Sequence, residues 1–371
     1  MKKILLLPFL NIPSGHLQAA EAISSHLQES DNKFYCKTVD IFSYSYGKYE
    51  KYVTKIYLEW IHRHPKSYNQ LYRHMVMKSL HEGKEKYFYE RFFYKQMENL
   101  ISDFRPDLIL CTHALPSRLL NNLKKEKGLK TPVINIYTDF FIHKGWGIYH
   151  IDGHLVATTK MKNFLLSKGV KKERIFITGI PVHPLLKKRP IIPEPPKFKA
   201  NILISGGSMG SGKLYSLIQQ LKNCRSSSHH YFVLCGKNHN LYEKLRSYRF
   251  KHITPLPYIA SRKMMDLVYN QTDLIVTKPG GVTVSECFIK RVPIMIYDKL
   301  PGQEEINCQE LKQMNLTLES KRWELPNGLE EEIRDFFHSP NTYSHYYSSM
   351  YDYEKSMDPY PAKDIILSSL S

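Results

Sequence analysis

Two neighbouring apolar runs late in the chain are each followed by a polar, glycine-containing loop and then by a helical pattern. The first run, residues 273–276, ends in Lys278-Pro279-Gly280-Gly281, and the second, residues 292–297, ends in Pro301-Gly302-Gln303-Glu304-Glu305. Alternation of strand and helix predicts a parallel sheet. Because parallel strands deliver the loops at their carboxyl ends to one edge of the sheet, where such sheets bind ligands, we expect both loops to line one binding site.

The same alternation runs through both halves of the chain. Residues 187–199 interrupt it with four prolines in a basic stretch, which predicts a stiff linker. With 371 residues the chain is long enough for two domains. We therefore predict an α/β protein of two domains with a cleft between them. The strands that we expect lie at 2–8, 34–41, 107–112, 133–138, 154–158, 175–178, 201–205, 231–235, 273–276 and 292–297.

The charge of the chain predicts an anionic partner. There are 53 Lys and Arg against 35 Asp and Glu, a formal net charge of +18. Nucleic acid, an acidic membrane surface and a phosphorylated substrate all fit this balance. In residues 44–100 the basic residues interleave with aromatic ones, among them Trp60, Arg63, Tyr72 and Arg73. Ordinary packing, an RNA-binding surface and an interfacial membrane patch remain open for this stretch.

Cysteine spacing and the first residues exclude other classes. The six cysteines are scattered without a CxxC pair, which argues against a zinc site and favours a reducing compartment. The apolar start of the chain is short and contains Pro8, so a first strand is favoured over a signal peptide. No run reaches the ~18–20 apolar residues that a membrane-spanning helix needs.

A glycine-rich loop at residues 205–213 follows a predicted strand and precedes a helix. Its backbone N–H groups, including those of Gly206, Gly207 and Ser208, and the helix dipole predict a phosphate site. Leu214 occupies the position at which a P-loop has its magnesium-binding Ser or Thr, so we do not expect an ATPase.

Three acidic or amide side chains suit a nucleotide sugar. Glu286 lies about one helical turn after Gly281, where it suits ribose hydroxyls, although a solvated first-turn glutamate is the plainer alternative. Gln303 and Glu304 suit sugar hydroxyls, and helix capping is the alternative for them.

Acid–base candidates lie in two loops of the first half. His16, in the loop after the first strand, is a candidate general base, and an exposed or structural histidine is the alternative. Asp139 and His143 follow another strand of the same half and are further candidates.

These residues together resemble the signature of the bacterial diacylglycerol glucosyltransferases and plant-type monogalactosyldiacylglycerol synthases. The resemblance extends to about residue 330. One departure is Asn11-Ile12-Pro13-Ser14, where the family has a glycine-rich loop. The motifs that carry the resemblance are Gly15-His16 with Ala19-Ala20, Thr112-His113-Ala114, Thr138-Asp139-Phe140 with His143 and Trp146, Thr178 to Val182, Lys278 to Glu286, and Pro301 to Glu305 with Asn307.

The resemblance implies a GT-B fold of two Rossmann-like domains with a cleft between them. It implies an N-terminal acceptor- and membrane-binding domain (1–186), the linker (187–199), a C-terminal UDP-sugar domain (200–340) and a tail (341–371) that packs back on the first domain. The implied reaction is inverting transfer of a hexose, glucose favoured over galactose, from a UDP-sugar to the 3-hydroxyl of diacylglycerol.

The resemblance also implies roles for individual residues. His16 would be the catalytic base, with Asp139 as its rival. The backbone of Ile180 and Val182 would bind uracil. The other donor residues would be Gly206, Gly207, Ser208, Lys278, Gly280, Gly281, Glu286, Gln303 and Glu304. Those expected on the acceptor or membrane side are Trp60, Arg63, Tyr72, Arg73, His113, His143 and Trp146.

Partners and location follow from the same resemblance. We expect UDP-glucose or UDP-galactose, diacylglycerol and an anionic membrane surface as partners, no nucleic acid, and no metal or other cofactor. The protein would be peripheral on the cytoplasmic face of the membrane. The alternatives are an N-acetylglucosamine transferase acting on a polyprenyl-linked peptidoglycan precursor, and a non-catalytic membrane- or RNA-binding protein.

Overall fold

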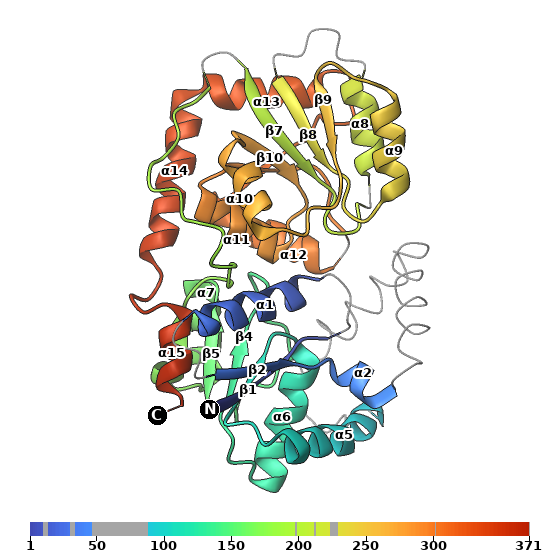
Figure 1. Ribbon diagram of the computed structural model, residues 1–371. Helices are drawn as coiled ribbons and strands as arrows, with labels where there is room; N and C mark the ends of the chain where they lie inside the picture. The colour runs from blue at the N-terminus through green and yellow to red at the C-terminus, as the bar shows by residue number, and fades with distance from the viewer. Residues whose placement is uncertain are drawn as a thin grey trace. The chain divides into compact units, whose positions relative to one another are not determined.

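The computed structural model describes residues 1–9, 14–29, 34–46, 88–196, 199–210, 213–222, 229–300 and 302–370. It divides into two compact units. Unit 1 comprises Met1–His183 together with Ser356–Ser371, and unit 2 comprises Pro184–Lys355. Each unit contains a six-stranded parallel sheet with helices, as the strand–helix alternation predicts (Figure 1).

The sheet of unit 1 has the strand order β2-β1-β3-β4-β5-β6, and every adjacent pair is parallel. The order reverses between β1 and β3, so the loops that leave these two strands diverge at their carboxyl ends. The strands are β1 (Lys2–Leu7), β2 (Phe34–Thr38), β3 (Leu108–Cys111), β4 (Val133–Ile136), β5 (Gly153–Val156) and β6 (Ile175–Ile177).

The helices of unit 1 bury one apolar face each. In α1, Ala19, Ala20, Ile23 and Leu27 are buried, and the last three share a core cluster with strand residues such as Ile4. Each such fully buried Leu or Ile stabilises the fold by about 1.5–3 kcal/mol. The helices are α1 (Gly15–Gln28), α2 (Ile41–Tyr46), α5 (Phe88–Phe104), α6 (Ala114–Lys127), α7 (Thr159–Ser167) and α15 (Ala362–Ser368), with a 3₁₀ turn η3 (Lys172–Arg174).

The sheet of unit 2 has the order β12-β11-β10-β7-β8-β9 and is also parallel. It reverses between β7 and β10. Two strands were not predicted: β9, which contains Pro255 and lies at an edge where proline is tolerated, and β12, which is only two residues long. The strands are β7 (Ala200–Ser205), β8 (His229–Leu234), β9 (Ile253–Leu256), β10 (Leu274–Thr277), β11 (Ile294–Ile296) and β12 (Leu318–Glu319).

The proline-rich stretch is held against helices of unit 2. The N–H of Arg189 donates to the carbonyl of Ile289 over 3.0 Å, and the hydroxyl of Tyr343 donates to that of Pro193 over 2.7 Å. The ammonium of Lys290, which is 1% exposed, bonds both the Lys187 carbonyl and the Asp266 carboxylate. The helices of unit 2 are α8 (Leu214–Lys222), α9 (His239–Ser247), α10 (Arg262–Asn270), α11 (Gly281–Lys290), α12 (Gln303–Gln313), α13 (Gly328–His338) and α14 (Pro340–Lys355).

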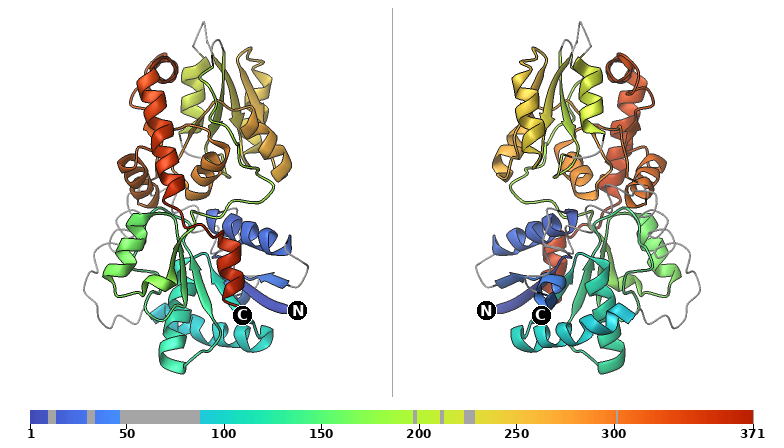
Figure 2. Two further views of the ribbon diagram at one scale, coloured as in Figure 1. Left: turned by 90° about the vertical axis from the view of Figure 1, so that its left-hand side faces the viewer. Right: turned by 90° about the vertical axis from the view of Figure 1, so that its right-hand side faces the viewer.

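The end of the chain is divided between the units, unlike the prediction for residues 341–371. α14 belongs to unit 2, because the hydroxyl of Tyr346 accepts from the N–H of Ile294 and donates to the carbonyl of Leu316. Only the segment from Ser356 belongs to unit 1. There α15 lies beside α1 and adds Ile365 and Ile366 to the core (Figure 2).

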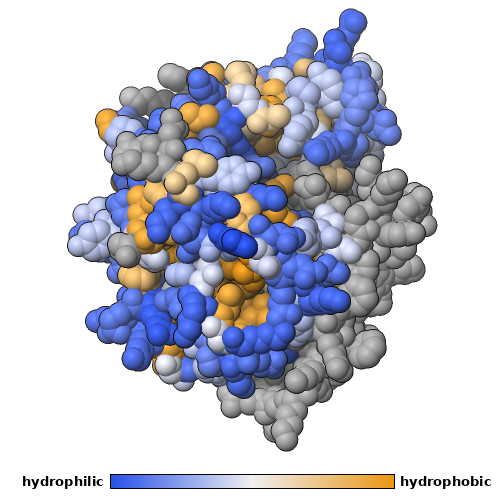
Figure 3. All heavy atoms as spheres, turned by 60° about the horizontal axis from the view of Figure 1, so that its bottom comes forward, coloured by the Kyte–Doolittle hydropathy of each residue, from blue (hydrophilic) through white to orange (hydrophobic). Residues whose placement is uncertain are grey.

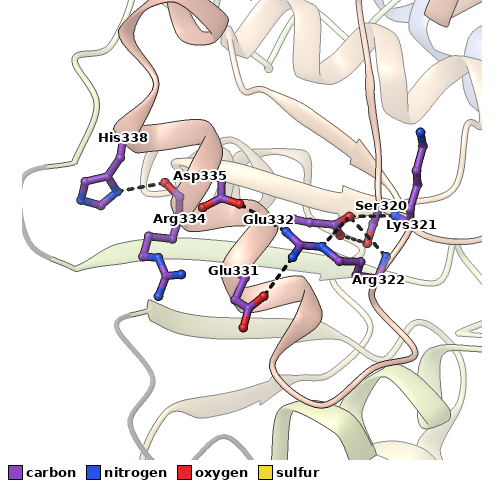
Figure 4. Close-up of polar contacts among 8 residues, drawn as sticks. All are labelled: Ser320, Lys321, Arg322, Glu331, Glu332, Arg334, Asp335 and His338. Carbon is purple, nitrogen blue, oxygen red and sulfur yellow. Dashed lines mark hydrogen bonds and ion pairs between the residues drawn. The ribbon is translucent and has the colours of Figure 1, made fainter.

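The turn after β12 is anchored on α13 (Figure 4). The Glu332 carboxylate accepts from the backbone N–H groups of Lys321 and Arg322 at 2.9 and 3.2 Å. The guanidinium of Arg322 reaches Glu331 and Asp335 at 3.0 and 3.2 Å. Because these groups are partly exposed, the backbone bonds fix the turn more than the ion pairs do.

Hydrophilic residues predominate on the face of the molecule shown in Figure 3, around a smaller hydrophobic area. Within the described residues, the structure contains no helix with the length and hydrophobicity required to span a membrane.

Candidate functional site

The reversal of strand order in unit 1 brings two loops with histidines together. β1 leads to α1, where His16 is the second residue, and β3 leads to His113 at the start of α6. Because β1 and β3 are adjacent, with Leu7 paired to Cys111, the two imidazole rings meet edge to face with their centroids 4.7 Å apart. The carboxyl edge of a sheet at such a reversal is where ligands bind in open α/β folds.

The tautomer of His16 is fixed by the backbone. Its Nδ1 lies 2.8 Å from the carbonyl oxygen of Thr112 and 2.8 Å from the hydroxyl of Thr138. A carbonyl oxygen only accepts, so Nδ1 carries the hydrogen and Nε2 of the neutral ring carries a lone pair. The Thr112 hydroxyl donates in turn to the His16 carbonyl over 2.9 Å. The ring is therefore oriented with a basic nitrogen available.

The surroundings of His16 keep that nitrogen unprotonated near neutral pH. Burial lowers the pKa of His16 below the usual imidazole value, while the charge of Asp139 and the bond to Thr112 raise it and only partly oppose the shift. Asp139 is 8% exposed. His16 and Asp139, two of the three side chains that the sequence suggests for acid–base roles, thus interact with each other.

His113 and His143 are also oriented by the backbone. The Nδ1 of His113 accepts from the N–H of Leu115 over 3.1 Å and so caps α6. The Nδ1 of His143 accepts from the N–H of Gly145 over 3.1 Å. Burial lowers the pKa of His113 well below the usual value and lowers the pKa of His143 to about 4, and the proximity of the other histidines contributes less.

The loop that carries His143 and Trp146 is rigidly supported. The amide of Asn135 donates to the carbonyl of Gly147 over 2.8 Å, and the N–H of Gly147 donates to the hydroxyl of Ser117 over 3.1 Å. Trp146 is 6% exposed and packs on Tyr137 with 4.5 Å between ring centroids. Its indole is thus a core group with little surface left for a membrane, which corrects the membrane part of its predicted role.

A cavity of about 390 Å³ opens at the carboxyl ends of β1 and β2, next to the residue that follows His16. The side chain of Asp40 is held there by the N–H groups of Phe42 and Ser43 at 3.0 and 3.4 Å. The lining is half polar and half apolar in character: Pro8, Leu17, Lys37, Thr38, Val39, Asp40, Ser43 and Tyr44. Trp60, Arg63, Tyr72 and Arg73 lie outside the described residues.

In unit 2 the glycine-rich loop and the Lys278–Gly281 loop lie where the strand order reverses between β7 and β10. Gly207 has a φ of +80° and Gly210 one of +56°, and a Cβ on Gly210 would lie 2.0 Å from the Cys235 carbonyl oxygen. Only glycine fits these positions. The N–H of Gly207 donates to the Ser205 hydroxyl and that of Gly210 to the Gly207 carbonyl. The sequence predicts a loop with N–H groups free for a phosphate, but the N–H groups of Gly207 and Gly210 are already bonded within the loop.

The loop after β10 presents the N-terminus of α11. The carbonyl of Pro279 is held by the amide of Asn307, from α12, over 3.2 Å. A Cβ on Gly280 would meet no atom within 4 Å, so space is open at this helix terminus. The helix dipole favours an anion in such a place. Lys278 and Gly281 are buried beside it.

Glu286 is held by two residues that carry no sequence motif. It is 7% exposed; the hydroxyl of Tyr269 donates to its Oε2 over 2.9 Å, and the guanidinium of Arg262 lies 3.6 Å from its Oε1. Burial raises the pKa of Glu286, while Arg262 and Tyr269 lower it. It is therefore not the solvated glutamate of the plainer alternative. Tyr269 and Arg262 were missed, since each is one residue of an amphipathic helix.

The remaining predicted donor residues are divided between the two units. Glu304 closes its own turn by accepting from the N–H of Leu300, as the capping alternative expects, and Gln303 is the first residue of α12. Ile180 and Val182 follow β6 in unit 1, where the Val182 carbonyl accepts from the Nε2 of His26 over 2.9 Å. The Val182 carbonyl therefore has a partner within unit 1.

The part of the chain that the structure describes contains no group of three or more His, Cys, Asp or Glu side chains placed to hold a metal ion. The described cysteines, Cys36, Cys111, Cys235, Cys287 and Cys308, are all free thiols.

Two family models match the chain. Residues 16–182 match the model described as monogalactosyldiacylglycerol (MGDG) synthase, and residues 201–356 match the glycosyltransferase family 28 C-terminal domain. Together these two ranges include most of the site residues described above, both those around His16 in unit 1 and those around Glu286 in unit 2.

Several bacterial proteins are similar to this chain over most of its length. A Bacillus subtilis (strain 168) protein described as the uncharacterized glycosyltransferase YkoN is 38% identical over 99% of this chain and 96% of its own length. A processive diacylglycerol beta-glucosyltransferase of Bacillus cereus (strain B4264) is 30% identical over 80% of this chain and 76% of its own length. A processive diacylglycerol beta-glucosyltransferase of Staphylococcus carnosus (strain TM300) is 28% identical over 83% of this chain and 78% of its own length.

Solved structures share the architecture at low sequence identity. A MurG of Acinetobacter baumannii superposes with a TM-score of 0.63 at 13% identity, covering 99% of both chains. The kitacinnamycin glycosyltransferase gives 0.62 at 13% identity, covering 100% of this chain and 99% of its own. Identities this low concern the fold alone.

Proposed function

Because the chain belongs to the family of monogalactosyldiacylglycerol synthases and diacylglycerol glucosyltransferases, we propose that it transfers a hexose from a UDP-sugar to the 3-hydroxyl of diacylglycerol. As a member of this family it is a glycosyltransferase, and its two parallel six-stranded sheets have the GT-B architecture of the structures above. The identities of the donor, of the hexose and of the acceptor are what we propose.

The observation that carries the proposal is the orientation of His16. Its Nδ1–H is tied to the Thr112 carbonyl, so Nε2 is the nitrogen that can take a proton. In the proposed reaction the acceptor hydroxyl gives its proton to Nε2 while its oxygen attacks the anomeric carbon. The bond from that carbon to the diphosphate oxygen breaks on the opposite face, so the configuration inverts and UDP leaves. Asp139 stabilises the imidazolium that forms.

We propose that the diphosphate, the ribose and the hexose of the donor are bound by residues of unit 2. Gly206, Gly207 and Ser208 lie at the diphosphate, Glu286 accepts from the ribose hydroxyls, and Gln303 and Glu304 contact the hexose. Lys278, Gly280 and Gly281 place the N-terminus of α11 beside the leaving group, whose charge the helix dipole stabilises. Uracil binds the backbone of Ile180 and Val182. The proposal includes no metal, since the sequence has no Asp-x-Asp motif.

The acceptor enters from a membrane in this proposal. Diacylglycerol is confined to bilayers, and a net charge of +18 favours an anionic surface. We propose that the protein acts as a peripheral enzyme on the cytoplasmic face. Glucose is favoured over galactose, a preference supported by the names of the two diacylglycerol beta-glucosyltransferases above.

An acceptor panel tests the proposal. The protein is incubated with UDP-glucose, UDP-galactose or UDP-N-acetylglucosamine and with diacylglycerol or a polyprenyl-linked peptidoglycan precursor, and UDP and glycolipid are measured. The proposal predicts hexosyl-diacylglycerol with UDP-glucose. Transfer of N-acetylglucosamine to the polyprenyl acceptor alone would replace it with the peptidoglycan alternative. Absence of UDP-sugar binding, with RNA or lipid still bound, would favour a non-catalytic protein.

A further inference from the structure

Three histidines of unit 1, His16, His113 and His143, differ in which ring nitrogen carries the hydrogen. Each has its Nδ1 bonded to a neighbouring group of the backbone, which decides what the Nε2 of the neutral ring presents. His16 donates from Nδ1 to a carbonyl, so its Nε2 is an acceptor. His113 and His143 accept at Nδ1 from N–H groups, so their Nε2 atoms carry hydrogen and are donors.

These rings form one cluster. His113 meets His16 edge to face with 4.7 Å between centroids, and its other side is stacked on Phe9 at 4.6 Å. The turn that carries His143 lies against the helix that His113 begins. A Cβ on Gly145 would be 2.8 Å from the His143 ring and 3.7 Å from the Cβ of Ala114. All three residues keep part of their surface exposed.

We propose that His113 and His143 bind the two ester carbonyl oxygens of the diacylglycerol acceptor through their Nε2–H groups, while the Nε2 of His16 receives the 3-hydroxyl. The inference rests on the proposed function and assigns its acceptor chemistry. Diacylglycerol has one hydroxyl and two ester carbonyls, and the cluster offers one acceptor and two donors. A hydrogen bond to each ester also holds the hydroxyl at His16.

The neutral state of the two donors is part of this arrangement. Burial lowers the pKa of His143 to about 4 and that of His113 well below its usual range, so neither competes with His16 for the hydroxyl proton. As neutral donors they recognise an uncharged ester without attracting phosphate, which a pair of imidazolium ions would bind.

Asparagine and glutamine separate the recognition of substrate from the structural role. An asparagine places its amide near the position of Nδ1 and keeps the backbone bond while it removes the Nε2–H donor. A glutamine places its amide near Nε2 and keeps a donor while it loses the backbone bond. For His113→Asn and His143→Asn we expect the KM for diacylglycerol to rise about 5- to 100-fold, with an unchanged KM for UDP-sugar and an unchanged Tm.

His113→Gln and His143→Gln are the matched variants. Because His113→Gln removes the N-terminal cap of α6, we expect its Tm to fall by roughly 2–4 °C while its KM for diacylglycerol changes less than that of His113→Asn. The reverse pattern, with His113→Asn normal and His113→Gln impaired in acceptor KM, would show a purely structural histidine and overturn the proposal.

A dialkylglycerol acceptor tests the ester contact directly. It has the same hydroxyl but ether oxygens in place of carbonyls, which are much weaker acceptors. The parent protein should prefer diacylglycerol, and the two asparagine variants should lose that preference because they lose only the contact to the carbonyls. Equal discrimination in parent and variants would overturn the assignment.

The experiments distinguish failure of this inference from failure of the proposed function. If the parent protein makes no glycolipid from diacylglycerol, the proposed function and the inference both fail. If it makes glycolipid, but neither His113→Asn nor His143→Asn changes the acceptor KM, only the inference fails.

Discussion

The Nδ1 of His16 donates its hydrogen to the backbone carbonyl of Thr112, 2.8 Å away. This contact joins the start of α1 to the end of β3, the two elements that diverge where the strand order of unit 1 reverses. The fold itself thereby selects the tautomer of the ring. A histidine placed at the carboxyl edge of a sheet by such a bond presents Nε2 to a ligand, as a general base must.

Replacing His16 by asparagine should stop turnover without unfolding the site. The amide of His16→Asn can still donate to the Thr112 carbonyl, but no nitrogen remains to accept a proton. We expect kcat to fall about 100- to 10,000-fold, with the KM for UDP-sugar unchanged. His150→Ala, which changes an exposed histidine of the same unit, is the control and should be fully active. Near-normal turnover in His16→Asn would move the base role to Asp139.

The pH profile should report the environment of His16. Burial lowers the pKa of His16 and Asp139 raises it, so the acidic limb of kcat/KM should lie below the usual imidazole value of 6.5. Asp139→Asn removes the raising contribution, so it should move this limb to still lower pH, and kcat should fall because the imidazolium loses its stabilising charge. A limb that moves to higher pH would contradict the assignment.

Tyr269→Phe should weaken donor binding. It removes the hydrogen bond to the buried Oε2 of Glu286 and so raises the pKa of that carboxyl further. We expect a rise of about 5- to 100-fold in the KM for UDP-sugar, since a buried acceptor loses its donor. Tyr346→Phe, which removes the bonds to Ile294 and Leu316 in the same unit, should lower the Tm and leave this KM unchanged. Equal kinetics in both variants would remove Glu286 from the donor site.

Binding to membranes should be electrostatic. With a net charge of +18 we expect the protein to sediment with vesicles that contain phosphatidylglycerol and not with purely zwitterionic vesicles. The bound fraction should fall as salt rises from about 0.05 to 0.5 M, because the Debye length shortens from about 14 to 4 Å. Binding that is insensitive to salt would indicate apolar insertion instead.

The sequence predicted the elements whose signal is local. The apolar runs before Gly206, Lys278 and Pro301 each end in a loop with glycine, and the structure has strands β7, β10 and β11 there. His16 could be selected because a Gly-His pair follows the first strand. These predictions succeed because strand alternation and loop glycines are readable from a few consecutive residues.

What the sequence could not provide depends on distant contacts. No pattern pairs Tyr269 with Glu286, or Thr112 with His16, since these contacts exist only after the sheet order is set. Pro255 hid strand β9, because proline is excluded from strands except at an edge. The place of α14 in unit 2 depends on hydroxyl bonds of Tyr346 that its amphipathic pattern does not reveal.

The most direct test of the proposed activity is the lipid product itself. The protein is incubated with UDP-glucose and vesicles of diacylglycerol and phosphatidylglycerol, and the lipid extract is analysed by mass spectrometry and by NMR of the anomeric proton. We predict a β-linked glucosyl-diacylglycerol formed in equal amount to the UDP released. No glycolipid with either UDP-glucose or UDP-galactose, in the presence of UDP-sugar binding, would contradict the proposed acceptor.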